Sequence, residues 1–237
     1  MSFLDKEGNS LLGVGVYTVP QAARLVRLPV ASVELVVGPD PTDQTPPRLF
    51  PIAVAELDLG FGEKIITFRG LMELWVAAQL RDAGISWPII RFAAYQASRV
   101  LRRRHPLTFG NFRTDGRTVF LSLRQAKRLP KTAIDLLDRQ QVFEDVIEQS
   151  LRPAIIVRDR EGRIQRWFPL GSKHQVVLDP QRRFGEPIDP VTGVPTASLS
   201  EAFRAEHENA AAAARWFGAT IKAVRDAVLF ERWLNKT

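Results

Sequence analysis

The sequence contains no cysteine among its 237 residues, which excludes disulfide bonds, thiolate metal sites and a cysteine nucleophile. It has only three histidines, His105, His174 and His207, and no two of them lie within one helical turn of each other. Transition-metal sites are built mainly from clustered histidine and cysteine. We therefore expect no metal, no cofactor and no metalloenzyme.

Long hydrophobic runs are missing as well. No apolar run reaches the roughly 18 residues that a membrane-spanning helix needs. The opening segment, "MSFLDKEGNS", carries acids and has no apolar stretch long enough for a signal peptide. We expect a cytoplasmic protein without a membrane partner, and its length is sufficient for two domains.

Positive charge is abundant but lies in one part of the chain. The formal net charge is +7 and the pI is about 10.2. Residues 61–130 contain 13 basic and 4 acidic residues, whereas residues 179–237 contain eight of each sign. A localised excess of this kind is typical of a surface that neutralises phosphates, although a solvated basic face would have the same composition.

A pair of short helices is predicted between Tyr17 and Val37. Two apolar stripes with helical spacing, over residues 19–26 and 30–37, are separated by Leu28 and Pro29. This is a helix-turn-helix pattern, in which the second helix enters the DNA groove. That second helix offers Ser32 and Glu34 but no basic or amide side chain that reads a base edge.

A second helical pair is predicted over residues 69–83 and from Ser86 onward, followed by a hairpin at Asp115 and Gly116. The later helix combines an apolar face with arginines, which bind phosphate through two oxygens at once. Helices followed by a basic hairpin are typical of a winged helix-turn-helix, although a hairpin is also a common structural element. The candidate DNA-binding residues are Arg69, Arg91, Arg99, Arg102, Arg103, Arg104, Arg113 and Arg117.

Residues 126–173 form a connecting segment in this interpretation. An amphipathic helix is predicted over residues 131–151, as a subunit interface or as a helix that packs on its own domain. A hairpin around Glu161 and Gly162 follows, and "HQVVL" is a candidate third strand.

The stretch "VVLDPQRRFGEPIDPVTGVPT", residues 176–196, is dense in the residue types of catalytic and phosphate-binding loops. Its prolines and glycines fix the path of the chain, and it lacks the glycine-rich entry into a helix that cradles phosphate. Asp179 and Asp189 could form an acid/base pair only across this loop, and we expect no histidine or third carboxylate to support them in that role. We therefore expect a structural role and no catalysis.

Three helices are predicted at the C-terminus, over residues 198–206, 209–217 and 220–234, with Asn209 and Thr220 as N-caps. The balanced charge of this part favours a protein partner over DNA. Aromatic residues here lie in the core or at an interface. The candidate partner-binding residues are Arg182, Arg183, Phe184, Phe203, Trp216, Phe217, Phe230 and Trp233.

The ordered motifs of both parts resemble a known group of proteins. "VVLDPQRRFGEP", "TGVPTASL" and "AARWFGATIKAVRDAVLFE" resemble the short C-terminal domain associated with antitoxins, and "YTVPQAARLV", "ITFRGLMELWV", "LRDAGISWPIIR" and "FRTDGRTVF" resemble the MerR-like helix-turn-helix domain of VapB-like antitoxins. The resemblance implies a bacterial type II antitoxin that binds a PIN-like toxin ribonuclease encoded by the adjacent gene and represses its own operon. It also implies that the loop with Asp179, Pro180, Phe184, Gly185 and Pro187 shapes the partner surface.

One segment departs from that group. Its members carry Trp, Arg and Gly-Tyr in and just after the second helix, where this sequence has "VELVVGPDP". The departure has two interpretations: the DNA surface lies on the basic helix over residues 91–104 and on the 113–117 hairpin, or DNA binding is weak or absent.

The resulting expectation is a mainly α protein with small β-hairpins. A winged helix-turn-helix (MerR-like) domain spans residues 1–125, and a three-helix, helix-turn-helix-like domain spans residues 174–237. The function expected is that of a non-enzymatic, dimeric antitoxin and autorepressor that binds operator DNA and forms a homodimer or a toxin–antitoxin hetero-oligomer. The alternative is a stand-alone MerR-like regulator whose C-terminal domain senses a small molecule in an apolar pocket.

Overall fold

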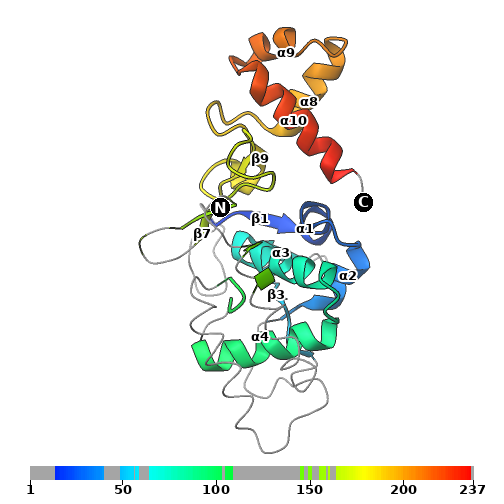
Figure 1. Cartoon of the computed structure of the whole chain (residues 1–237), viewed down its shortest axis with the longest axis vertical. Helices are drawn as coiled ribbons and strands as arrows, with labels where there is room; N and C mark the ends of the chain where they lie inside the picture. The colour runs from blue at the N-terminus through cyan, green and yellow to red at the C-terminus, as the bar shows by residue number, and fades with distance from the viewer. Residues whose placement is uncertain are drawn as a thin grey trace, which may run out of the picture. The chain divides into compact units, whose positions relative to one another are not determined.

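The computed structural model describes residues 14–39, 49–55, 57–58, 64–102, 105–108, 145–146, 149–150, 155–158, 160 and 164–235. In these residues the protein is mainly α-helical with small β-sheets (Figure 1), as expected from the sequence. None of the described helices is long and apolar enough to cross a membrane.

The chain divides into two compact units. One comprises residues 17–152, and the other comprises residues 1–16 together with 153–237. We call them the N-terminal unit and the C-terminal unit. The expected domain start at residue 174 lies between two strands of one sheet of the C-terminal unit. The described part of the expected connecting segment from residue 155 onward therefore belongs to that unit.

The N-terminal unit opens with a short strand and two short helices: β1 (Val16–Thr18), α1 (Val19–Val26) and α2 (Val30–Val36). Helix α1 begins at a capping box, in which the Thr18 side chain and the Gln21 side chain bond each other's backbone N–H groups. It ends at Arg27 in the left-handed conformation, and α2 starts directly after Pro29. Both predicted helices are thus present, with three residues between them.

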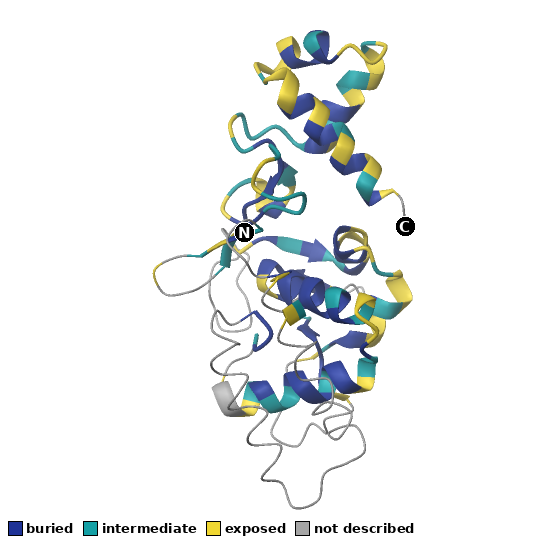
Figure 2. Ribbon diagram, viewed as in Figure 1, coloured by how far each residue is buried: buried dark blue, intermediate teal, exposed yellow. Residues whose placement is uncertain are grey.

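Small sheets surround the central helix of this unit. Strands β2 (Val37–Gly38) and β3 (Ala53–Val54) pair in parallel, and β4 (Leu57–Asp58) pairs antiparallel with β5 (Lys64–Thr67) in a sheet of order β1-β5-β4. Helix α3 (Phe68–Asp82) packs against α1, β3 and β5 and is buried on nearly all sides (Figure 2). A Cβ on Gly70 would lie 2.5 Å from the Ile66 side chain, so glycine permits the tight turn from β5 into α3. Helix α4 (Trp87–Leu101) completes the unit.

The C-terminal unit combines an antiparallel sheet with three helices. The sheet has the order β6-β7-β8-β9, formed by β6 (Ile156–Arg158), β7 (Ile164–Trp167), β8 (Val177–Leu178) and β9 (Pro187–Ile188). A 3-10 turn, η2 (Arg183–Gly185), lies between β8 and β9. Trp167 of β7 is completely buried.

The three helices are α8 (Thr196–Ala205), α9 (Ala210–Phe217) and α10 (Ile221–Leu234). Asn209 and Thr220 cap α9 and α10 as predicted, and Gly218 ends α9 in the left-handed conformation. Their shared core consists mainly of small side chains and contains Leu199, Ala210, Ala213, Ala214, Ala223, Val224 and Ala227.

Several predicted elements agree with the structure and others were missed. The helices α1 to α4 and α8 to α10, the β6–β7 pair and the third strand β8 lie close to their predicted positions. Strands β1, β2, β3, β4, β5 and β9 were not predicted. The 113–117 hairpin lies outside the described residues, as does most of the predicted 131–151 helix, of which residues 145–146 and 149–150 are helical.

Candidate nucleic-acid and partner-binding surfaces

Three of the predicted DNA-binding arginines of the N-terminal unit are exposed. Arg69 lies in the first turn of α3, Arg99 in the last turn of α4, and Arg102 caps α4 in the left-handed conformation. The Arg99 guanidinium lies 5.7 Å from the Tyr95 ring centroid and donates a 3.3 Å hydrogen bond to its hydroxyl. Arg103, Arg104, Arg113 and Arg117 lie outside the described residues.

Arg91 has a different environment from the other predicted DNA-binding residues. It is only partly exposed, and its Nη2 donates a hydrogen bond to the backbone carbonyl of Leu35 at the end of α2. Burial lowers the pKa of this guanidinium from its usual value. Arg91 therefore ties α4 to α2, and its assignment as a DNA-binding residue stays a prediction.

The surface of α2 lacks positive charge. The helix exposes Val30, Ala31, Glu34 and Leu35 and buries Val33 and Val36. Apolar and acidic side chains do not neutralise phosphates, so the expectation that α2 is poorly suited to base reading agrees with its exposed residues.

A buried carboxyl group that the sequence did not reveal lies in the middle of the N-terminal unit. Glu73 of α3 is fully buried and accepts hydrogen bonds from the Leu107 N–H (3.2 Å), the Thr108 N–H (2.9 Å) and the Thr108 hydroxyl (2.9 Å). Burial raises its pKa to about 8, and the three hydrogen bonds oppose this shift only in part. Glu73 fastens the 107–108 turn to α3, and its complete burial leaves no access for a substrate.

The loop over residues 179–195 is held by its own polar side chains. Asp179 accepts hydrogen bonds from Arg166 Nε of β7 (2.9 Å) and from the Gln181 N–H (3.0 Å). Asp189 accepts from both the N–H (2.8 Å) and the hydroxyl (2.7 Å) of Thr192. The two carboxylates thus serve separate local turns, which agrees with the expected structural role of this stretch.

The predicted partner residues of this loop divide into one internal and two exposed side chains. Arg182 Nη1 donates a 2.7 Å hydrogen bond to the Pro190 carbonyl, so this guanidinium braces the loop. Arg183 and Phe184 are exposed and adopt positive φ values of 48° and 53°. The Phe184 side chain is 60% exposed, so it is accessible to a partner.

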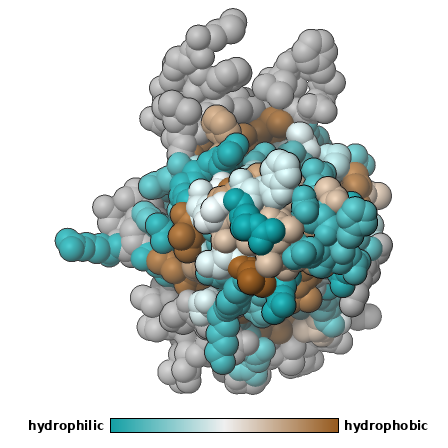
Figure 3. All heavy atoms as spheres, turned by 90° about the horizontal axis from the view of Figure 1, so that it is seen from above, coloured by the Kyte–Doolittle hydropathy of each residue, from teal (hydrophilic) through white to brown (hydrophobic). Residues whose placement is uncertain are grey.

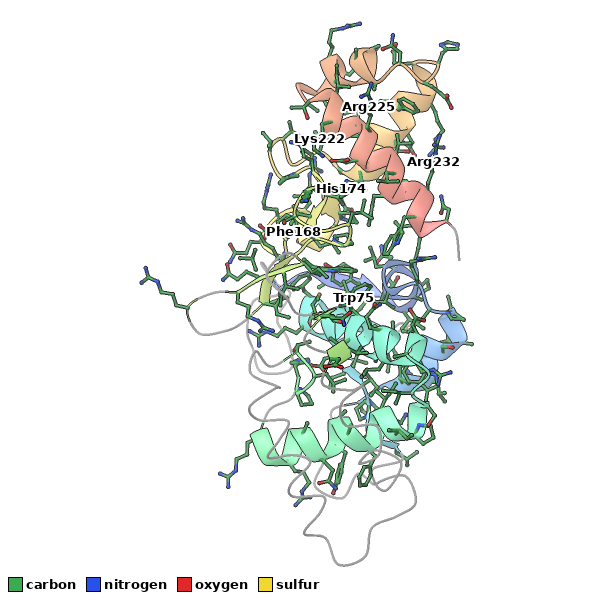
Figure 4. The ribbon with its side chains drawn as sticks, in the orientation of Figure 1. Trp75, Phe168, His174, Lys222, Arg225 and Arg232 are labelled. Carbon is green, nitrogen blue, oxygen red and sulfur yellow. The ribbon has the colours of Figure 1, made fainter. Side chains whose placement is uncertain are left out.

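A polar junction joins the sheet region to α10 within the C-terminal unit (Figure 4). Asp226 accepts a hydrogen bond from the Gln175 N–H (2.8 Å) and one from Lys222 Nζ, and its Oδ1 lies 3.0 Å from His174 Nδ1. Burial raises the pKa of Asp226, but the hydrogen bonds from Lys222, Gln175 and His174 together lower it below its usual value. The junction holds α10 in place, and none of its groups is a nucleophile with an activating base.

The predicted aromatic anchors also differ in accessibility. Phe230 is completely buried and stacks on the partly buried Trp233 with a centroid distance of 5.6 Å. Phe203 packs against the helical core. The assignment of Phe230 as a partner-binding residue is therefore corrected: its ring belongs to the core of its own unit.

Trp216 and Phe217 lie on the surface at the end of α9. Trp216 is 75% exposed, and Phe217 and the nearby Ile221 at the start of α10 are also exposed. The Trp216 indole N–H donates a 3.0 Å hydrogen bond to Glu206, which restrains the ring. We call Trp216, Phe217 and Ile221 the aromatic corner. Figure 3 shows a face on which hydrophobic residues are interspersed among hydrophilic ones.

One further set of surface residues was not predicted. Lys222, Arg225 and Arg232 are exposed along α10 (Figure 4), and we call them the α10 basic face. Sequence reasoning missed them because the charges of this part of the chain sum to zero. Among the described residues, no group of histidine, cysteine, aspartate and glutamate is arranged to hold a metal ion.

Comparison with known proteins gives a structural similarity. No family model matches the sequence, and no curated protein matches it. The chain is similar to the crystal structure of Rv2018 from Mycobacterium tuberculosis, with a TM-score of 0.70 and 25% sequence identity. The similarity covers 92% of this chain and 99% of that chain, so it extends to residues of both units.

Proposed function

We propose that the protein is the antitoxin of a bacterial type II toxin–antitoxin system. In this proposal its C-terminal unit binds a PIN-like ribonuclease toxin in the cytoplasm, and its N-terminal unit, a MerR-like winged helix-turn-helix, represses the operon. The resemblance of the sequence motifs to VapB-like antitoxins motivates the proposal. The observation that carries it is the exposed Trp216 of the aromatic corner, whose ring is restrained by its hydrogen bond to Glu206.

An exposed tryptophan whose ring is restrained is suited to a protein interface. Isolated large apolar side chains exposed on a surface need no explanation, but here three lie within six residues around the α9–α10 turn. The hydrogen bond from Trp216 to Glu206 restricts the ring before binding, so less side-chain entropy is lost on association. Tryptophan is enriched among the residues whose truncation costs an interface about 2 kcal/mol or more.

The DNA-binding half of the proposal is supported by the N-terminal unit. Helices α1 and α2 follow each other with a three-residue turn, as in helix-turn-helix motifs. Arg69, Arg99 and Arg102 are exposed and are available to phosphates. A homodimer or a toxin–antitoxin hetero-oligomer would present two copies of this unit to a palindromic operator.

The test is co-expression of the tagged protein with the product of the adjacent gene, followed by affinity purification and size-exclusion chromatography. We expect a stable complex and relief of the neighbour's toxicity. Trp216→Ala should weaken the complex at least about 30-fold, as loss of an interface tryptophan does. Trp216→Phe keeps an aromatic ring but loses the hydrogen bond to Glu206, so it should lose less affinity than Trp216→Ala.

Val191→Ala is the matched control, because Val191 is 72% exposed in the same unit but lies outside the aromatic corner. A harmless neighbour that does not bind would contradict the antitoxin proposal and favour the stand-alone regulator. Equal binding of the wild type and Trp216→Ala would show that the partner does not bind at the aromatic corner.

A further inference from the structure

Folding separates the acidic and basic residues of the α8–α10 helices. Over residues 196–235 the sequence has five acidic and five basic residues, and this balance argued against a nucleic-acid surface. All five basic residues are exposed in the structure. Two of the five acids, Asp226 and Glu231, are buried, so the surface of these helices carries an excess of positive charge.

The two buried acids are the only acids of α10, and both have internal partners. Asp226 is bonded in the junction with the 174–175 turn, and Glu231 accepts a 2.7 Å hydrogen bond from the Thr196 hydroxyl of α8. The exposed positions of α10 therefore carry no acidic residue. Buried and exposed positions alternate along this helix (Figure 2).

The α10 basic face has a defined spacing. Arg225 and Arg232 are seven residues apart, which is about two helical turns or 10 Å, with the exposed Leu229 between them on the same side. Lys222 lies about one turn before Arg225 and forms an ion pair with Asp226. Neither the Arg225 nor the Arg232 side chain forms a hydrogen bond or an ion pair with another described residue.

The connection before α10 is that of a helix-turn-helix motif. Helix α9 ends at Phe217, three residues follow that include the left-handed Gly218, and α10 begins at Ile221. In such motifs the second helix enters the major groove. With 14 residues α10 is about 21 Å long and carries its basic residues along the side away from the helical core.

We propose that α10 is a second DNA-contacting element, which binds the phosphate backbone at the major groove through Arg225 and Arg232. This surface extends the DNA-binding half of the proposed function and does not require the toxin. A duplex fits the α10 basic face because no exposed position of α10 carries an acid and because arginine is a common phosphate ligand.

The test uses the purified full-length protein and a fluorescein-labelled duplex of about 30 base pairs, with binding followed by anisotropy between about 50 and 200 mM salt. The double variant Arg225→Ala with Arg232→Ala should reduce the steepness of log K against log salt by about 1.8, because each phosphate contact contributes about 0.9. At about 50 mM salt this corresponds to a loss of affinity on the order of 100-fold. The double substitution to lysine should restore most of the salt dependence, because it restores the charge.

Arg160→Ala with Arg204→Ala is the matched control, since it removes the same charge from exposed positions of the same unit that do not belong to α10. Circular dichroism of each variant verifies the fold. An unchanged salt dependence in the Arg225 and Arg232 variant would overturn the proposal, as would a wild-type protein that does not bind the duplex. Loss of the complex with the adjacent gene product, with DNA binding intact, would also overturn it and assign this face to an acidic protein partner.

Discussion

The buried carboxyl of Glu73 predicts an unusual dependence of stability on pH in the N-terminal unit. Its pKa is about 8 in the folded protein and near 4.5 when the side chain is solvated in the unfolded chain. Between these two values the folded protein holds a proton that the unfolded chain has lost. The free energy of unfolding therefore falls as pH rises through this window.

The size of the effect follows from the two pKa values. One pKa unit corresponds to 1.36 kcal/mol, so Glu73 should lower the free energy of unfolding by about 1.4 kcal/mol per pH unit and by about 5 kcal/mol over the whole window. Its contribution is complete below about pH 4.5 and is lost once pH exceeds about 8.

Glu73→Gln removes this titration and keeps the shape of the side chain. The NH₂ group of glutamine would face the N–H of Leu107 or of Thr108, so two donors would meet without an acceptor. This mismatch should lower the free energy of unfolding by about 1–3 kcal/mol at low pH. Because the variant lacks the penalty of an ionised group, its stability relative to wild type should improve steadily as pH rises.

Urea unfolding of wild type and Glu73→Gln at a series of pH values, followed by circular dichroism, measures this difference. Hydrogen exchange at the amides of Leu107 and Thr108 gives a local readout, because both donate to Glu73. Glu34→Gln, at an exposed position of α2, is the control and should parallel the wild type. Parallel profiles for wild type and Glu73→Gln would refute the reasoning, as would a carboxyl ¹³C titration of Glu73 with a midpoint near 4.5.

Two further predictions concern the C-terminal unit. Asn209→Ala removes the acceptor of the Ala211 and Ala212 N–H groups at the start of α9 and should lower the free energy of unfolding by about 1 kcal/mol, measured by urea unfolding; no change would show that the cap is dispensable. Asp226 has a lowered pKa, so its contribution to stability is present at neutral pH and is lost as pH falls through that pKa. Asp226→Asn should therefore have a lower free energy of unfolding at neutral pH, and its free energy of unfolding should fall less than that of the wild type as the pH becomes acidic. An equal fall in both proteins would contradict this assignment.

The helices could be predicted from the sequence because their signals are local. Thr18, Asn209 and Thr220 cap helices by bonding N–H groups two or three residues away, and Gly218 ends one by its own backbone conformation. Each of these features is contained within a single turn of chain, so a pattern of a few residues is sufficient to identify it.

The short strands depend on partners elsewhere in the chain. Strands β2 and β3 have only two residues each, and their parallel pairing joins residues 37–38 to residues 53–54. Strand β9 pairs with β8 across the 3-10 turn. Two-residue strands have no detectable alternation of apolar and polar residues, which explains why the sequence did not indicate them.

The candidate surfaces were predicted less well because they depend on which charges are buried. Arg91 has the sequence signature of a surface arginine, but it bonds Leu35 more than fifty residues away. Asp226 and Glu231 count as surface charge in the sequence, whereas partners distant in the chain hold both inside. The net charge of a segment therefore did not give the charge of its surface.

The small side chains between α8, α9 and α10 have a thermodynamic consequence. Five of the seven residues of this core are alanines, so the helices approach closely and these positions remove less hydrocarbon from water than leucines would. The heat capacity change of unfolding scales with the apolar surface that becomes exposed. The helical part of the C-terminal unit should therefore have a smaller heat capacity increment, and a shallower stability curve, than a leucine-rich bundle of the same length.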